Sequence, residues 1–213
     1  MPTVNTRNIM VGAGHLYIST NDRQEPMPVT APAAGASIKT VLDTAPASPV
    51  TTPATSAFRY VGATDGGVEV TFSPDIGEVE VDQLKDSALI FNTGQSMSVG
   101  TSLAEPTLAN LLVSWGFASS QMTGGGDTLN IPAMPDDMVE RSIVLVGNAP
   151  RGSTTGATKR ERTYYGRRCV SVEGGAHTLS RTEAATLPIM FRMLPDTTAP
   201  AGAEYGTIVD RTI

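Results

Sequence analysis

Acidic side chains recur at every second position in the middle of the chain, at Glu78, Glu80 and Asp82. Carboxylate oxygens are the ligands that hard cations such as Ca²⁺ prefer. In an extended strand, side chains two residues apart lie in a row along one face, and a row cannot surround an ion unless loop ligands join it. We therefore predict no metal site at these residues.

The same region could instead hold an acid–base pair. Segments 68–72 and 78–82 alternate between apolar and polar residues, which predicts two half-buried strands, and the intervening Ser73–Asp75 is typical of a turn. Such a hairpin would place Glu69 opposite Glu78, in the way that glycoside hydrolases place two carboxylates. The neighbouring sequence does not indicate a sugar cleft, so we do not expect this chemistry.

Few other residues have side chains that could act in catalysis or metal binding. The chain has two histidines, His15 and His177, and we expect both to be exposed at strand starts. Its single cysteine, Cys169, is predicted to be a small buried residue on a strand. The chain contains neither a zinc-type Cys/His spacing nor a hydrolase or metalloprotease motif. We therefore expect no catalytic residues, no metal and no cofactor.

Two glycine-rich segments resemble phosphate-binding loops only superficially. Gly12 and Gly14 precede a predicted strand at 15–20, whereas a dinucleotide site needs a strand before the glycines and a helix after them. Gly124–Gly126 could form an anion-binding nest, but the Lys-Ser/Thr pair and helix of a P-loop do not follow. We interpret both segments as turns.

Composition favours an all-β chain. The 213 residues include 21 glycines and 15 prolines, and only 17% are charged, which favours strands joined by turns over long exposed helices. The net charge of −6 argues against a sequence-reading nucleic-acid binder. The first residues lack the apolar core of a secretory signal, and no apolar run reaches ~18 residues. We expect a soluble protein synthesised in the cytoplasm.

The expected elements form one domain over residues 1–213. Besides the hairpin above, strands are predicted near 15–20 and at 58–61, 89–99, 143–146, 163–172 and 187–193. The strand at 89–99 is expected to kink at Gly94, and the strand at 143–146 to be covered on both faces. Pro188 indicates that the strand at 187–193 lies at an edge or contains a bulge. An arm at 1–14, a Pro/Thr-rich loop at 21–57 and a loose tail at 197–213, with a short strand near 205–209, complete the chain.

One helix is expected at about 105–115. Its apolar stripe repeats at helical spacing and is formed by Leu108, Leu111, Leu112 and Trp115. Ser102 and Glu105 have the spacing of a capping box, and a start with Pro106 as the first helical residue is equally compatible with the sequence. Gly116 is placed to end the helix. Because a helix this short is marginal alone, its stripe must pack on the sheet.

Charge is segregated along the chain. Between Asp65 and Asp86 lie seven of the 21 acidic residues and one lysine, and between Arg151 and Arg168 lie six of the 15 basic residues and one glutamate. Two solvated faces would explain this pattern. The alternative is a head-to-tail contact in which the basic segment of one copy meets the acidic surface of another. On that hypothesis the contact residues are Arg160, Arg162, Arg167 and Arg168.

Three segments in fixed order resemble a known family: Gly77–Gln83 within the acidic hairpin, Leu103–Leu111 at the start of the helix, and Leu187–Asp196 near the end. Together with the Gly-led first strand, they resemble the major tail (tail tube) proteins of long-tailed, siphovirus-type bacteriophages. The resemblance covers roughly residues 9–20 and 58–196. The loop at 21–57 and the glycine loop near 125 have no counterpart in it.

The resemblance implies a β-sandwich or partial barrel with one flanking helix. Six copies would form a ring whose inner strands join into a β-barrel, and rings would stack into the hollow tail tube of the virion. Implied partners are further copies of the chain, the tape-measure protein, and the tail terminator and distal tail proteins. Double-stranded DNA would pass through during ejection, and no membrane is involved. The family has no catalytic residues.

A lumen that conducts DNA should repel phosphate, and Glu78, Glu80 and Asp82 are our candidates for its lining. Two other functions remain open. One is a different virion part, such as a capsid decoration or head-completion protein. The other is a carbohydrate-binding β-sandwich module, although only 5% of residues are aromatic and the helix stripe includes Trp115.

Overall fold

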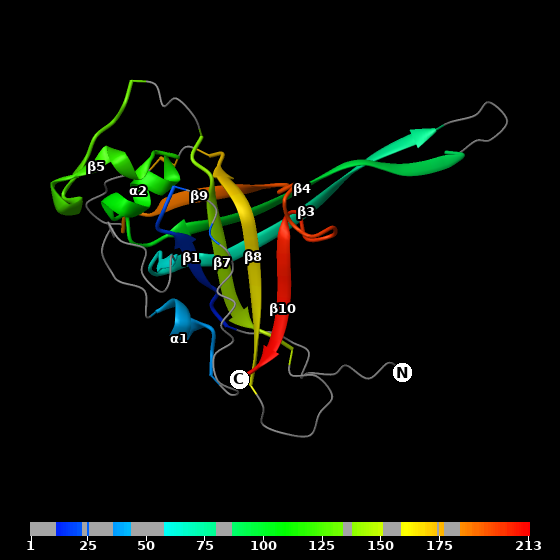
Figure 1. The fold of residues 1–213 in the computed structure, drawn as a ribbon, viewed down its shortest axis with the longest axis horizontal. Coiled ribbons are helices and arrows are strands. Elements are labelled where there is room, and N and C mark those ends of the chain that lie inside the picture. Colours follow the sequence, from blue (N-terminus) through cyan, green and yellow to red (C-terminus); the bar gives the residue numbers. More distant parts are fainter. Residues whose placement is uncertain are drawn as a thin grey trace.

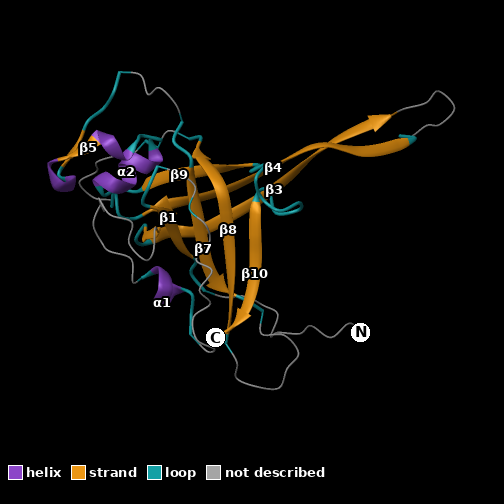
Figure 2. Ribbon diagram, viewed as in Figure 1, coloured by secondary structure: helices purple, strands orange, loops and turns teal. Residues whose placement is uncertain are grey.

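The structure is a computed structural model that describes residues 12–22, 25, 36–43, 58–79, 87–133, 138–150, 159–173, 175–176 and 184–213. Within these ranges the chain is mainly β, as composition predicted: one eight-stranded antiparallel sheet, one two-stranded sheet and two short α-helices (Figures 1 and 2). The described strands do not close into a barrel.

The large sheet has the strand order β2-β1-β7-β8-β9-β4-β3, and β10 also pairs with β8. Its strands are β1 (His15–Ser19), β2 (Phe58–Tyr60), β3 (Thr64–Val79), β4 (Leu89–Leu103), β7 (Arg141–Asn148), β8 (Arg160–Ser171), β9 (Leu187–Leu194) and β10 (Gly206–Thr212). The small sheet pairs β5 (Met122–Thr123) with β6 (Thr128–Leu129). The helices are α1 (Lys39–Leu42) and α2 (Leu108–Ser114), and short 3₁₀ turns span Ser119–Gln121 and Gly124–Gly126.

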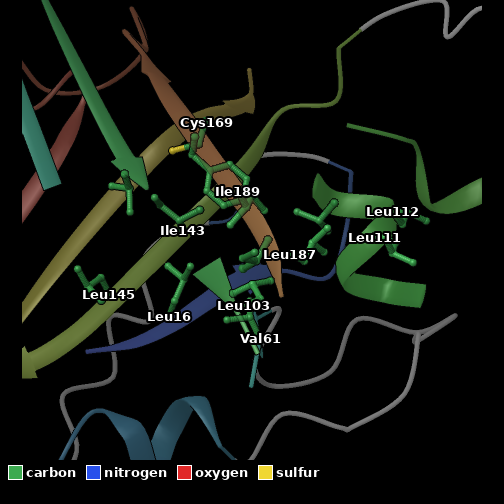
Figure 3. Close-up of a cluster of buried hydrophobic side chains, with 14 of the residues drawn as sticks. Leu16, Val61, Leu103, Leu111, Leu112, Ile143, Leu145, Cys169, Leu187 and Ile189 are labelled. Atoms are coloured by element: carbon green, nitrogen blue, oxygen red, sulfur yellow. The ribbon is translucent and has the colours of Figure 1, made fainter. Parts of the chain in front are cut away.

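Strand β7 divides the core into two clusters. Its side chains at 143–146 are all buried, which confirms the prediction of a strand covered on both faces. Ile143 and Leu145 lie in the main cluster, with Leu16, Cys169 and Ile189 among others (Figure 3). The second cluster lies on the opposite face of the sheet and contains Tyr17, Ile38, Leu42, Phe58, Val144, Val146 and Tyr165.

The sheet folds over the main cluster, so that strands far apart in the sheet order approach each other. Val68 and Val70 of β3 pack against this cluster although four strands lie between β3 and β1 in the sheet order. A Cβ added at Gly14 would lie 2.9 Å from Leu145 Cδ1 of β7 and 3.6 Å from Val68 Cγ2. A side chain at this position would therefore displace the end of the Leu145 side chain, and glycine lets the two ends approach without that adjustment.

Helix α2 covers the main cluster, but it begins later than expected. Thr107 is its N-cap, and the Thr107 hydroxyl accepts a hydrogen bond from the Asn110 N–H at 3.3 Å. Glu105 instead accepts from the Ala63 N–H at 2.8 Å, which fastens the loop after β2. The capping box with Ser102 and the alternative start at Pro106 are therefore both wrong.

The end of α2 matches the sequence prediction. Gly116 has a φ of 70°, its N–H donates to Val113 O, and the Phe117 N–H donates to Leu112 O, which together form a Schellman ending. The Trp115 indole N–H donates to Gly175 O at 2.9 Å. Within the predicted stripe, Leu111 and Leu112 are buried, and Leu108 and Trp115 pack against the edge of the cluster.

Strand β3 is one continuous strand of 16 residues, so the predicted turn at Ser73–Asp75 is wrong. Pro74 pairs with Gln95 of β4, and the only irregularity nearby is a bulge between the pairs Asp75–Gly94 and Ile76–Asn92. This bulge accounts for the kink predicted at Gly94. Pro74 is tolerated because, among the described strands, β3 is paired on one edge alone.

Two segments expected to be irregular contain regular structure. Within 21–57, helix α1 covers the second core cluster, where Ile38 and Leu42 are buried. The prediction of a loose tail at 197–213 is wrong, because β10 pairs with β8 over residues 206–212. The short strand predicted near 205–209 lies within the tail and overlaps β10. The arm before residue 12, most of 21–57, and His177 lie outside the described residues.

Candidate functional site

The far half of the β3–β4 hairpin projects from the body of the molecule as a two-stranded ribbon (Figure 1). We call the described residues 72–79 and 89–97 the ribbon. Its strands pair with each other up to Val79–Leu89, whereas β9 pairs with β4 only from Met97 onward. The ribbon beyond this point therefore has no third strand from the described part of the chain.

The ribbon exposes apolar side chains on both faces. Side chains at even positions of β3 continue the face of Val68 and Val70, and on this face Ile76 and Ile90 are 60% and 61% exposed. The opposite face carries Val79, Leu89 and Phe91, which are also exposed. Gly77 lies opposite Phe91, and a Cβ at Gly77 would be 2.8 Å from Phe91 Cζ, so the ring lies over the glycine.

The outer edge of β3 is a second unusual feature. No described strand pairs with it over the 16 residues from Thr64 to Val79. The outer edge of β10 is likewise unpaired among the described strands. Long unpaired edges are templates for pairing with another chain unless they are shortened, charged or covered. Two such edges on one molecule could pair with each other between copies.

The acidic residues predicted to share one face of a hairpin lie on both faces of β3. Glu69 and Glu78 lie on the same strand and on opposite faces, because nine residues separate them without a bulge in β3. They therefore cannot face each other as a glycosidase pair. Glu78 is exposed and accepts a hydrogen bond from the Ser87 hydroxyl at 2.6 Å. Glu80 and Asp82 lie outside the described residues.

A hollow of about 240 Å³ lies where the ribbon leaves the body. The Tyr205 hydroxyl donates to Gln95 O at 3.3 Å across it, and hydrogen bonds from backbone N–H groups, led by that of Gly202, lower the pKa of the Glu204 carboxyl. Its lining comes from the ribbon and from the loop before β10: Phe72, Gln95, Met97, Gly202, Glu204, Tyr205 and Gly206.

Comparison with known proteins assigns no family. No family model matches this chain, and no curated protein matches it. The geometry of the ribbon and of the sheet edges therefore carries the functional argument.

The four candidate contact arginines all have partners within the chain. Arg162 pairs with Asp210, and Arg168 with Glu140, and hydrogen bonds to those carboxylates raise the pKa of both guanidinium groups. Arg167 lies 3.9 Å from Asp196 and 5.7 Å from the centroid of the Tyr165 ring, and Arg160 donates to Pro150 O at 3.4 Å. All four lie on β8 and are at most partly exposed.

Four further features of the described residues bear on function: possible metal-binding groups, membrane-spanning helices, the cysteine and His15. Within them, no three His, Cys, Asp or Glu side chains are grouped closely enough to hold a metal ion. None of the described helices has the length and apolar character needed to cross a membrane. Cys169 is fully buried as predicted, and burial raises the pKa of its thiol. His15 is half-buried and contacts Lys39, with Nζ 2.9 Å from Nε2, so its predicted exposure is wrong.

The sequence pattern did not predict that the ribbon is an exposed projection. It assigned the apolar residues of 68–82 to one buried face, because a local alternation does not reveal how far a strand extends beyond the core. The available signal was the apolar run Leu89–Phe91, which follows an acidic segment and is too short for a buried helix.

Proposed function

We propose that this chain is a structural subunit that assembles with copies of itself into stacked rings, and that the stacked rings form the tail tube of a long-tailed bacteriophage. The observation that carries the proposal is the ribbon: six large apolar side chains are exposed on a two-stranded projection that the described chain does not cover. Exposed apolar side chains concentrated on one projection favour an interaction site. The resemblance of three segments to tail tube proteins supplies the identity of the assembly.

The sheet edges support a self-assembling subunit. The outer edges of β3 and β10 offer unpaired backbone groups, and in a ring each copy could pair one edge with its neighbour. The sheet already folds over its core without closing, so additional strands from neighbours would extend it. On this proposal the subunit is a partial barrel, and the inner strands of six copies complete a β-barrel around a channel.

The proposed channel conducts DNA and surrounds the tape-measure protein during assembly, and the tube ends against the tail terminator and distal tail proteins. Glu78, Glu80 and Asp82 are proposed to line the channel, where negative charge would prevent DNA from adhering. Changing all three to Lys should leave the subunit folded and slow DNA ejection from assembled particles. Unchanged ejection would remove these residues from the channel.

The four arginines of β8 are a separate part of the proposal. Because each already has a partner within the chain, a contact between copies would have to share or exchange those partners. Raising ionic strength should then weaken assembly. Assembly that is insensitive both to salt and to Arg→Ala changes at 160, 162, 167 and 168 would leave them with purely intrachain roles.

Electron microscopy of the purified full-length chain over a range of concentrations tests the proposal as a whole. We expect six-fold rings, tubes, or both. A chain that stays monomeric at every concentration, also when mixed with other virion proteins, contradicts self-assembly. Binding to preformed capsids without tubes would instead indicate a decoration or head-completion protein.

A further inference from the structure

A single buried carboxylate connects three segments that are distant in sequence. Glu161 of β8 is 3% exposed and lies on the face of the second core cluster. Its Oε2 accepts a hydrogen bond from the Ser37 hydroxyl at 2.5 Å, and its Oε1 accepts from the Ile38 N–H at 2.8 Å. These two bonds fasten the start of α1, since the Ser37 hydroxyl also accepts from the Lys39 N–H.

The positive partner of the same carboxylate comes from the C-terminal strand. Arg211 of β10 lies directly opposite Glu161 in the β8–β10 register, and its Nε is 3.3 Å from Glu161 Oε1. A second guanidinium nitrogen of Arg211 donates to Ala36 O at 3.5 Å, just before α1. Glu161 therefore has hydrogen-bond donors from the start of α1 on one side and an ion-pair partner from β10 on the other.

Both attached elements are peripheral in the fold. Helix α1 is a single turn, which is unstable without tertiary contacts. Strand β10 pairs only with β8 among the described strands, and edge elements open more readily than central ones. Attachments that do not involve Glu161 include the hydrogen bond from Tyr17 to Asp43, at 2.7 Å, for α1, and the ion pair of Arg162 with Asp210 for β10.

The electrostatics of the site link the two elements. If β10 leaves, Glu161 loses its cation while α1 still covers it, and an uncompensated buried charge is strongly unfavourable. If α1 leaves, the carboxylate loses two charge-assisted hydrogen bonds and gains access to water, which weakens its attraction for Arg211. Each element is thus more stable when the other is in place.

We propose that Glu161 couples α1 and β10, so that the helix and the C-terminal strand dock and open together. Opening of the pair would expose part of the second core cluster, because Ile38, the N-cap of α1, and Leu42 are buried in it. An event at the β10 edge would therefore control access to an apolar surface on the same face of the sheet, over β1, β7 and β8. This inference does not depend on the proposed assembly.

Amide hydrogen exchange on the full chain under conditions that keep it monomeric tests the coupling. Ser37→Ala removes a hydrogen-bond donor to Glu161 on the α1 side and leaves the contacts of β10 with Glu161 unaltered. We expect faster exchange at the α1 amides of Leu42 and Asp43, and also about five- to tenfold faster exchange throughout β10. The α2 amides are the internal control and should not change, which excludes global destabilisation.

Arg211→Gln tests the reverse direction. It removes the cation on β10 and should accelerate exchange at Leu42 and Asp43 as well as in β10, whereas Arg211→Lys keeps the charge and should restore much of the protection. In an E161Q background, Ser37→Ala should no longer affect β10. Exchange that rises in α1 alone for Ser37→Ala, or in β10 alone for Arg211→Gln, would overturn the proposal even if E161Q does not fold.

Discussion

Arg162 and Asp210 form a bidentate ion pair across the β8–β10 ladder. They are directly opposite in the register, with Arg162 Nε 2.6 Å from Asp210 Oδ1 and Nη2 2.7 Å from Oδ2. The pair lies on the face opposite the Glu161–Arg211 contact, because adjacent residues of a strand point to opposite sides. Strand β10 is thus held by charge on both faces of the sheet.

This pair predicts a specific pH dependence of stability. Hydrogen bonds from Arg162 lower the pKa of the Asp210 carboxyl below its usual 3.8. A carboxyl with a lowered pKa stabilises the fold above its unfolded-state pKa, and this contribution disappears as pH falls through the folded-state pKa. Asp210→Asn should therefore lower the free energy of unfolding at neutral pH by about 0.5–1 kcal/mol, since the pair is partly accessible to water.

Urea unfolding of both proteins across the acid range measures this effect. The difference between them should be constant above roughly pH 5 and should shrink below pH ~4 as Asp210 becomes protonated. A difference that is absent at neutral pH, or that grows on acidification, contradicts the assigned role of the pair.

The Schellman ending of α2 predicts a backbone effect at Gly116. With a φ of 70° and no atom within 4 Å of an added Cβ, Gly116→Ala introduces backbone strain without a steric clash. We expect a loss of about 1–2 kcal/mol. Gly147→Ala is the matched control: it too has open space around an added Cβ, but its φ is not positive, so it should be tolerated. Thermal unfolding of the two variants separates these outcomes.

A buried hydroxyl in the second core cluster predicts a neutral or stabilising substitution. Thr163 is fully buried on β8 and pairs with Val146 and Val209, and its Oγ1 has no hydrogen-bond partner among the described residues. Thr163→Val removes that unsatisfied group at nearly constant volume, so stability should be unchanged or rise by up to about 1 kcal/mol. Thr163→Ser keeps the hydroxyl and loses a methyl group, and should cost about 1 kcal/mol. Calorimetry that ranks Ser above Val would contradict this view of the site.

Some elements could be predicted from the sequence because a local pattern decided them. The run 143–146 is apolar at every position, and only a strand buried on both faces accommodates that. Alternation over 187–193 likewise predicted the inward residues of β9, and Pro188 lies where β9 pairs with β4 but not with β8. Gly116 ends α2 because few other residues adopt a positive φ at low cost.

Other elements could not be predicted because distant contacts decided them. Ser73–Asp75 has strong turn propensity, yet pairing with β4 at 14 positions outweighs it, and proline is tolerated in strands at a sheet edge. Helix α1 forms around two buried side chains and the Glu161 carboxylate, which is 124 residues from Ser37 in sequence. The projection of the ribbon depends on where β9 stops pairing with β4.

The ribbon provides the most direct test of the surface that carries the proposed assembly. Ile76→Thr combined with Ile90→Thr removes two exposed apolar side chains from one face and keeps β-branched residues in both strands. Because neither side chain contributes to the described core, the free energy of unfolding of the monomer should change by less than about 0.5 kcal/mol. Association should weaken at least about tenfold, since burying each isoleucine contributes roughly 1.5–3 kcal/mol and about 1.4 kcal/mol corresponds to a tenfold change in affinity.

Sedimentation velocity over a concentration series measures that association. Ile131→Thr is the matched control, because Ile131 is 69% exposed but follows the small sheet rather than the ribbon. We expect the control to assemble like the parent chain while the double variant remains at lower mass. Equal assembly of all three proteins would mean that the ribbon is not buried between copies, and the edges of β3 and β10 would then be the remaining candidates for the contact.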